Sequence, residues 1–330
     1  MEFDRLKPGW IIYTDLYALK TSDGTSTQTI AGDTTEYGYK EGMASEARFS
    51  DIGGFAQLTE NSVVVVDRGY HCLRHISRFS SFTSRFSGYC MRPGYENGKP
   101  GYFKRPTSVA IDRMDNNQLL VTDHHNNAVR TVTIDTRIVG TFAQSPSLEH
   151  IESLTQHPGG DIYVIAWHAI YRISYKYRYV TLTSGKAGMV GGYRDSTLLD
   201  SLFYLPSRLL FTSNQHIVVT DTYNNKLRLV DLYYDRVTTL NICVKCLNEP
   251  DSLLLTQSYL YIGQLDGITK VSGKLQKQTI CITPDSRFTL DFILHCGCLW
   301  YFCSLHLKHI HQHLYIIQNL QPILGSKLLL

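Results

Sequence analysis

The stretch IVVTDTYNNKLRLV, residues Ile217–Val230, decides how the rest of the chain is interpreted. An apolar, β-branched run ends at Asp221, a polar Thr-Tyr-Asn-Asn turn follows, and a second extended run carries Arg228. Asn is typical of such turns because it tolerates a positive φ. The stretch therefore predicts two antiparallel strands joined by a tight turn.

The same hairpin recurs along the chain. LLVTDHHNNAVRTV at Leu119–Val132 and VVVVDRGYHCLRHI at Val63–Ile76 both keep an Asp seven positions before an Arg. Three weaker copies lack part of the signature: IIYTDLYALK at Ile11–Lys20, IYVIAWHAIYRI at Ile162–Ile173 and LYIGQLDGITKV at Leu260–Val271. The anchor positions are 15, 67, 123, 166, 221 and 264, with spacings of 43 to 56 residues. Repeats of short strands at this spacing predict propeller blades, each stable only against its neighbours.

The segments between copies carry a second repeat. Three of them share Gly-Tyr, an acidic or Asn residue two positions after the Tyr, and then a Phe. The sets are Gly38, Tyr39, Glu41 and Phe49; Gly94, Tyr95, Asn97 and Phe103; and Gly192, Tyr193, Asp195 and Phe203. The glycines allow sharp turns. We expect each Phe to fill the crevice between adjacent sheets before the next inner strand begins.

Hairpin and linker together resemble NHL-repeat proteins, over about residues 10–283. The pattern is D-x-x-N-x-x-x-R, joined by AG…GY-x-(D/E/N)-G…A-x-F-x-x-P linkers. The copies at Ala166 and Gln264 depart from it. The resemblance implies an all-β, six-bladed β-propeller. Such propellers are usually platforms that bind protein, RNA or carbohydrate, and a minority are enzymes.

The ends of the chain do not follow the repeat. Residues 10–292 form the predicted propeller, and residues 293–330 form an irregular tail rich in Cys, His and apolar residues. The first copy has no strand before Ile11–Thr14, so either Ser286–Phe292 supplies that inner strand or the chain is a fragment of a longer protein. The N-terminal MEFDRLKPGW has no apolar run and is not a signal peptide. The sequence therefore does not indicate the cellular compartment of the protein.

The amino-acid composition excludes few classes of function. Hydrophobic residues at 43% and charged residues at 18% are ordinary for a globular chain, and a net charge of +3 does not by itself indicate nucleic-acid binding. The apolar run Phe292–Leu307 is short for a membrane span and holds two histidines, so a span is not expected. Eight cysteines could form disulfides if the protein is extracellular, and Cys72 and Cys90 lie on strands that could be neighbours.

The repeated Asp and Arg residues are interpreted as structural. Across a hairpin, each Asp can accept a charge-assisted hydrogen bond from its Arg, and a catalytic residue is not expected in three equivalent blades. The repeat positions are Asp67, Arg74, Asp123, Arg130, Asp221 and Arg228.

No catalytic residues, metal site or cofactor is predicted. The sequence has no G-x-S-x-G and no phosphate loop. Cys243 and Cys246 form a single C-x-x-C without a second pair. The tail residues Cys296, Cys298, Cys303, His306, His309, His311 and His313 match no zinc spacing.

We therefore expect a non-enzymatic module that binds a protein partner. One alternative is a metalloenzyme, a lyase or hydrolase, with its site at the central channel; among propellers resembling this one, some lyases hold a metal with blade histidines, here His71, His124, His168 and His216. Another is RNA binding through YRISYKYRY, Tyr171–Tyr179. Glycan is a third possible ligand. The candidate binding residues are His124, His125, Tyr223, Arg172, Lys176 and Arg178.

Overall fold

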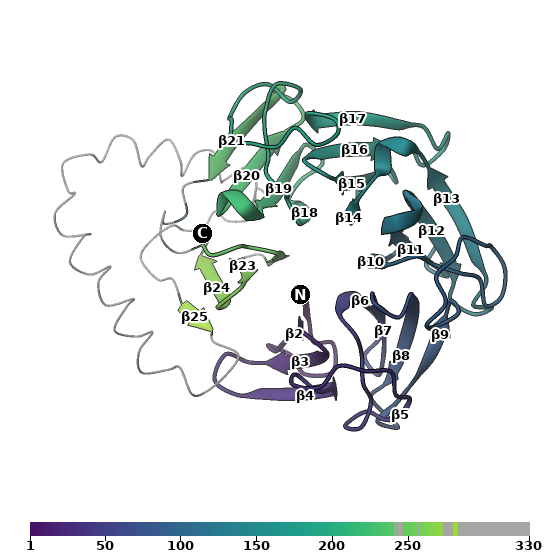
Figure 1. Ribbon diagram of the computed structural model, residues 1–330. Coiled ribbons are helices and arrows are strands. Elements are labelled where there is room, and N and C mark those ends of the chain that lie inside the picture. Colours follow the sequence, from purple (N-terminus) through teal and green to yellow (C-terminus); the bar gives the residue numbers. More distant parts are fainter. Residues whose placement is uncertain (241, 243–246, 257, 273–279, 283–330) are drawn as a thin grey trace.

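The computed structural model describes residues 1–240, 242, 247–256, 258–272 and 280–282. These residues form six antiparallel sheets arranged in a ring around a central axis (Figure 1). The chain is thus an all-β, six-bladed β-propeller, as the repeat predicts. The predicted tail and Ser286–Phe292 lie outside the described residues.

The blades follow one another in chain order. Blade 1 contains β1 (Glu2–Phe3), β2 (Ile11–Asp15), β3 (Ala18–Ser22) and β4 (Thr27–Gly32). Blade 2 contains β6 (Ile52–Thr59), β7 (Ser62–Asp67), β8 (Cys72–Ser77) and β9 (Phe82–Ser87), with β5 (Gly42–Met43) added outside β9. Blade 3 contains β10 (Pro106–Ile111), β11 (Gln118–Asp123), β12 (Ala128–Thr133) and β13 (Val139–Gln144).

The second half repeats this order. Blade 4 contains β14 (Ile151–Gln156), β15 (Ile162–Ala166), β16 (Ala169–Ile173) and β17 (Val180–Gly185). Blade 5 contains β18 (Arg208–Phe211), β19 (His216–Asp221), β20 (Lys226–Asp231) and β21 (Arg236–Leu240). Blade 6 contains β22 (Ser252–Leu255), β23 (Tyr259–Gln264), β24 (Gly267–Ser272) and β25 (Ile280–Ile282). Short 3-10 helices lie at η1 (His124–Asn126), η2 (Pro146–Leu148) and η3 (Thr222–Asn224).

The predicted anchors mark one position in every blade. Each is the last residue of the second strand; they are Asp15, Asp67, Asp123, Ala166, Asp221 and Gln264. In blades 3 and 5 the hairpin turn closes on Asn127 and Asn225, whose φ values are 51° and 52°. The Asn residues of the repeat thus supply the left-handed conformation that the turn requires.

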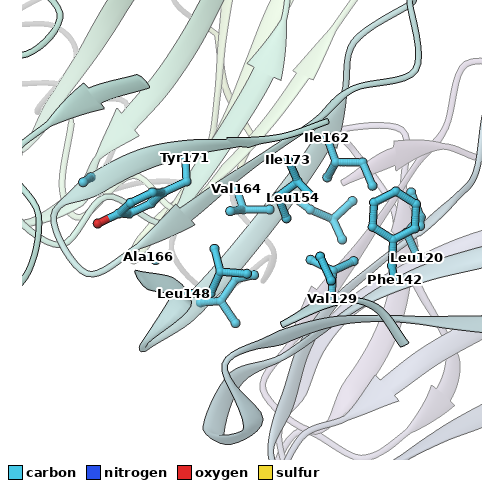
Figure 2. Close-up of a cluster of buried hydrophobic side chains, with 13 residues drawn as sticks. Leu120, Val129, Phe142, Leu148, Leu154, Ile162, Val164, Ala166, Tyr171 and Ile173 are labelled. Carbon is cyan, nitrogen blue, oxygen red and sulfur yellow. The ribbon is translucent and has the colours of Figure 1, made fainter. Parts of the chain in front are cut away.

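The core lies between blades rather than within them. Figure 2 shows one such layer, where Leu120, Val129 and Phe142 of blade 3 face side chains of blade 4 such as Val164 and Ile173. The linker residues Phe49, Phe103 and Phe203 are completely buried in the corresponding layers. Each packs with strands of the blades before and after it, so the expectation that Phe fills the crevice is confirmed.

The first blade differs from the prediction. Its inner strand is β1, in which Glu2 pairs with Ile12 and Phe3 pairs with Ile11. The expectation that the N-terminal segment contributes no such strand is wrong, because MEFDRLKPGW folds back: Asp4 accepts hydrogen bonds from the backbone N–H groups of Leu6 and Lys7. The propeller therefore begins before the predicted boundary at residue 10. Among the described residues, no helix is long and apolar enough to cross a membrane.

Candidate binding surface

One face of the ring gathers the turns between second and third strands together with the linkers between blades. We call it the linker face. At five blades the turn donates a backbone hydrogen bond to the linker that precedes its blade: Arg68 to Asp51, His125 to Lys104, Trp167 to His150, Tyr223 to Tyr204 and Leu265 to Asn248. Turns and linkers therefore form a continuous surface around the channel mouth.

Buried ion pairs hold this surface in blades 2, 3 and 5. Arg Nη1 lies 3.1 Å from the carboxylate in Asp67–Arg74, 2.8 Å in Asp123–Arg130 and 2.6 Å in Asp221–Arg228. None of these six side chains is exposed. Burial raises the pKa of each of the three Asp carboxyls, while hydrogen bonds and the Arg charge oppose that rise. Buried carboxylates of this kind have no route to a substrate on the face.

Each ion pair also fixes the linker before its blade. In blade 3, the N–H of Lys104 donates to Asp123, and Arg130 donates to the carbonyls of Tyr102 and Glu96 and to the side chain of Asn97. Corresponding bonds run from Arg228 to Leu202, Arg194 and Asp195 in blade 5. The Arg of every pair also lies between the linker Tyr and Phe rings, at 4.5–5.5 Å from their centroids. The hairpin repeat and the linker repeat thus form one interacting unit. We call this unit the clamp: it consists of the Asp–Arg ion pair together with the linker carbonyls and the Tyr and Phe rings that contact the Arg.

Blade 2 uses a different connection. In blades 3 and 5, Asn126 and Asn224 bond to the anchor Asp and to a linker carbonyl, but blade 2 has Tyr70 at this position. Here a disulfide joins Cys72, at the start of β8, to Cys90 in the following linker. The disulfide ties the turn of blade 2 to the linker that leads into blade 3, and Met91 N–H donates to the Tyr70 carbonyl beside it.

A row of aromatic rings crosses the linker face from blade 3 to blade 5. We call it the aromatic row. Neighbouring ring centroids are 4.9 Å apart for His124–His150, 3.8 Å for His150–Trp167, 5.5 Å for His168–Tyr204 and 5.7 Å for Tyr204–Tyr223. His125 adds to one end, 4.9 Å from His124, and His168 lies 5.9 Å from Trp167. His125, Tyr204 and Tyr223 are exposed, and His150 and Trp167 are partly exposed.

Four histidines of this face have a lowered pKa. Burial lowers the pKa of His71, His125, His150 and His168, and the charge of Arg105 lowers the first three further. Backbone N–H groups donate to the Nδ1 atoms of His71 and His168, which also requires those nitrogens to be unprotonated. The lowered pKa values therefore favour the neutral form of these four histidines at neutral pH.

Three predicted binding residues belong to this row. His125 and Tyr223 are exposed at the turn tips of blades 3 and 5. His124 is buried beside His125, with Nδ1 3.0 Å from the Ile151 carbonyl and 3.2 Å from Glu152. The structure therefore brings His125 and Tyr223 to one surface and places His124 as the support between blades 3 and 4.

The other three lie away from it: Arg172 is in β16, and Lys176 and Arg178 are at the turn between β16 and β17. Arg172 is paired with Asp161, and the guanidinium of Arg178 stacks 3.5 Å from the centroid of Phe142 in blade 3. Lys176 lies over Tyr177, which stacks with Tyr179. Two of the three cations proposed for RNA are therefore engaged within the protein.

The four histidines considered as metal ligands do not converge on one position. His71, His124 and His168 each bond to a different linker or strand, and His216 lies at the start of β19, 3.4 Å from Asp231. Within the described residues, no group of three or more His, Cys, Asp or Glu side chains has metal-binding geometry. Cys243, Cys246 and the cysteines and histidines of the tail lie outside that part of the chain.

Sequence reasoning missed Trp167, His150 and Tyr204. Trp167 follows Ala166, the anchor of blade 4. Its φ of 51° belongs to a tight two-residue turn between β15 and β16. His150 and Tyr204 lie in linkers of different length. The available signal was their place in the repeat: Trp167 is in the turn between second and third strands, and His150 and Tyr204 come shortly before an inner strand, so all three lie on the same face.

Comparison with known proteins supports the fold. No protein-family model and no curated protein matches the sequence. An auxiliary nutrient binding protein from Bacteroides ovatus matches with a TM-score of 0.60 and 13% identity, over 79% of this chain and 65% of its own. A chain of a nidogen/laminin complex matches at 0.57 and 10%, over 79% and 88%. The extracellular domain of BT3049 from B. thetaiotaomicron matches at 0.55 and 14%, over 87% and 35%. At these identities the likeness shows the fold alone.

Proposed function

We propose that this chain is an NHL-like propeller that binds a protein partner on its linker face without catalysing a reaction. The observation that carries the proposal is the aromatic row, a partly exposed strip that crosses three blades. Trp and Tyr rings dominate the energetics of protein interfaces because they bury large areas at low entropic cost. The NHL assignment itself rests on the paired hairpin and linker motifs and on the clamp that they build.

Further apolar side chains extend the surface around the channel. Leu16 and Leu265, at the turn tips of blades 1 and 6, are 62% and 72% exposed. Met189 and Val190, in the linker before blade 5, are 69% and 57% exposed. Contiguous exposed apolar groups on one face are typical of interaction sites.

The clamps favour binding by keeping this face in one conformation. A surface whose backbone is already ordered loses little conformational entropy when a partner binds. Tyr204 illustrates this, since its backbone N–H donates to Asp221 while its carbonyl accepts from Tyr223. The ion pair therefore orients two exposed rings of the row.

Loss of partner capture in a surface variant tests the proposal. The variant is His125→Ala with Tyr223→Ala, both exposed. Its control is Tyr177→Ala with Tyr179→Ala, two rings that are 60% and 70% exposed but lie away from the linker face. Partners cross-linked to the wild type should be lost from the first variant and kept by the second, with unchanged melting temperatures in both.

Two results would contradict the protein-binding proposal. If the first variant keeps every cross-linked partner, the row is not the interface. If ribonuclease removes the partners, or a soluble glycan competes for them, the propeller recognises RNA or carbohydrate instead.

A further inference from the structure

The central channel contains an arginine that the binding surface does not explain. Arg208 begins β18, the inner strand of blade 5, and reaches across the channel to two other blades. Its Nη1 donates to the hydroxyl of Ser108 in β10 at 3.2 Å and to that of Ser153 in β14 at 3.5 Å. Both serines are at least 97% buried, with exposed fractions of 3% and 0%.

The level at which Arg208 lies is otherwise lined by small residues. Arg208 pairs with Thr220, one position before the anchor of blade 5. Ser153 and Ser252 occupy the matching position in blades 4 and 6, and Ser108 lies at the register shift in blade 3. In blade 2, Gly53 is so close to blade 3 that a Cβ would lie 2.2 Å from the Thr107 carbonyl. Arg208 therefore crosses a narrow polar ring next to the linker face, and the buried amino group of Met1 lies close enough for the two positive charges to interact.

The charge of Arg208 has no direct counterion among the described residues. It forms no salt bridge there, and its Nε and Nη2 atoms donate to no acceptor in that part of the chain. Burial lowers its pKa, the charge of Asp251 opposes that effect, and the charge of Arg68 adds to it. Two serine hydroxyls are weak compensation for a desolvated guanidinium.

A second arginine beside the mouth has an unsatisfied donor. Arg68, in the turn of blade 2, pairs with Asp51 at 3.5 Å and with Glu152 at 3.7 Å, yet its buried Nε has no partner. Glu152 is shared with His124, at 3.2 Å. Glu152 is thus shared between Arg68 and His124, and the Nε of Arg68 is left without an acceptor.

We propose that the channel mouth is a binding site for the carboxylate group of a small ligand. The free Nε–Nη2 edge of Arg208 is a planar pair of donors that matches the two oxygens of a carboxylate. The hydroxyl protons of Ser108 and Ser153, which accept from Arg208, are available as further donors. A singly charged group fits better than a phosphate dianion, because Glu152 and Asp251 would repel additional negative charge.

Acetate is the probe that tests this site, with inorganic phosphate as the second arm. Thermal unfolding and isothermal titration at constant ionic strength, maintained with sodium chloride, would measure saturable binding. We expect acetate to bind the wild type, at least ten-fold weaker binding to Arg208→Met, and no change in Arg113→Met. Arg113 is exposed on the turn between β10 and β11, on the opposite face.

The variant Arg208→Lys tests whether ligand binding depends on the planar geometry of the guanidinium or only on its positive charge. It keeps the positive charge without the planar pair of donors, so acetate binding should fall while any phosphate binding is largely kept. Absence of saturable acetate binding to the wild type, or equal binding to the wild type and Arg208→Met, would overturn the site. Phosphate binding more tightly than acetate would overturn the carboxylate assignment. The His125→Ala, Tyr223→Ala variant should bind acetate normally, so this test is independent of the protein-binding proposal.

Discussion

At the residue scale, the ion pair of each strong repeat does more than close a hairpin. In blade 5, Asp221 accepts from Arg228, Asn224 and the backbone of Tyr204, and so joins the third strand, the turn and the linker. Position in the sequence predicts this pairing. Asp221 lies opposite Lys226, so Arg228, two positions further along the partner strand, points to the same side of the sheet and lies diagonally across from Asp221. The linker carbonyls that share the Arg are up to 34 residues away, and no local pattern indicates them.

Removing the acid of this pair should destabilise the fold. Asp221→Ala leaves Arg228 fully buried with only Asp195, which is 40% exposed, as a counterion. We expect a loss of about 3 kcal/mol in the free energy of unfolding, because a buried charge loses its partner. Urea denaturation of Asp221→Ala beside Asp266→Ala measures it. Asp266 is exposed, and its substitution should change stability by less than about 0.5 kcal/mol. An Asp221→Ala protein as stable as the control would contradict the structural role.

Protonation of His168 should destabilise the linker face. Leu205 N–H donates to its Nδ1 at 3.0 Å, and burial lowers its pKa. The unfolded chain, with an ordinary His pKa of about 6.5, therefore binds a proton more readily than the folded chain. This contribution to stability is complete above about pH 6.5 and is lost as the pH falls below it.

Comparing urea midpoints at pH 8 and pH 5 checks this prediction. The wild type should lose more stability between the two pH values than His168→Gln, whose amide oxygen can still accept from Leu205 but does not titrate. The other histidines of the face titrate in both proteins and cancel in the comparison. An identical pH dependence in both proteins would show that His168 does not contribute.

At the scale of elements, the sequence predicts hairpins and linkers better than it predicts the surface they form. The three clamped blades follow from motifs, and even the weak copies at Ala166 and Gln264 end their strands at the predicted residue. No sequence motif predicts the aromatic row. Its rings come from turns and linkers of three blades, and the contact between His150 and Trp167 depends on how blade 4 begins, not on a repeated residue.

The Cys72–Cys90 disulfide should take over the stabilising role of the missing Asn in blade 2. It closes a segment with a sequence separation of 18, for which chain-entropy arguments give about 3 kcal/mol. Replacing both cysteines by serine should lower the free energy of unfolding by about that amount. Dithiothreitol should destabilise the wild type similarly and leave the double variant unaffected. Alkylation of Cys72 in the non-reduced wild type would show that the bond does not form.

At the scale of the whole molecule, the ring is not equally strong at every blade junction. Blade 1 has no clamp, since its anchor Asp15 pairs with the partly exposed Lys20, and β1 pairs with only two residues of β2. Among the described residues, the core between blades 6 and 1 consists mainly of Ile11, Tyr13, Tyr261 and Ile268. Phe3 adds an edge contact to Tyr261 at 6.1 Å. Blades 3 and 4 share the much larger layer of Figure 2.

We therefore expect the ring to open first between blades 6 and 1. Local opening has a lower free energy where fewer apolar contacts must be broken, and hydrogen exchange measures that free energy. Amides of β2 and β23 should exchange faster than those of β11 and β15. Tyr261→Ala should accelerate exchange in blades 1 and 6 and leave blade 3 unchanged. Tyr171→Ala, in the layer between blades 3 and 4, is the matched control and should accelerate exchange only there. Protection of β2 and β23 as strong as that of β11 would contradict a weaker junction between blades 6 and 1.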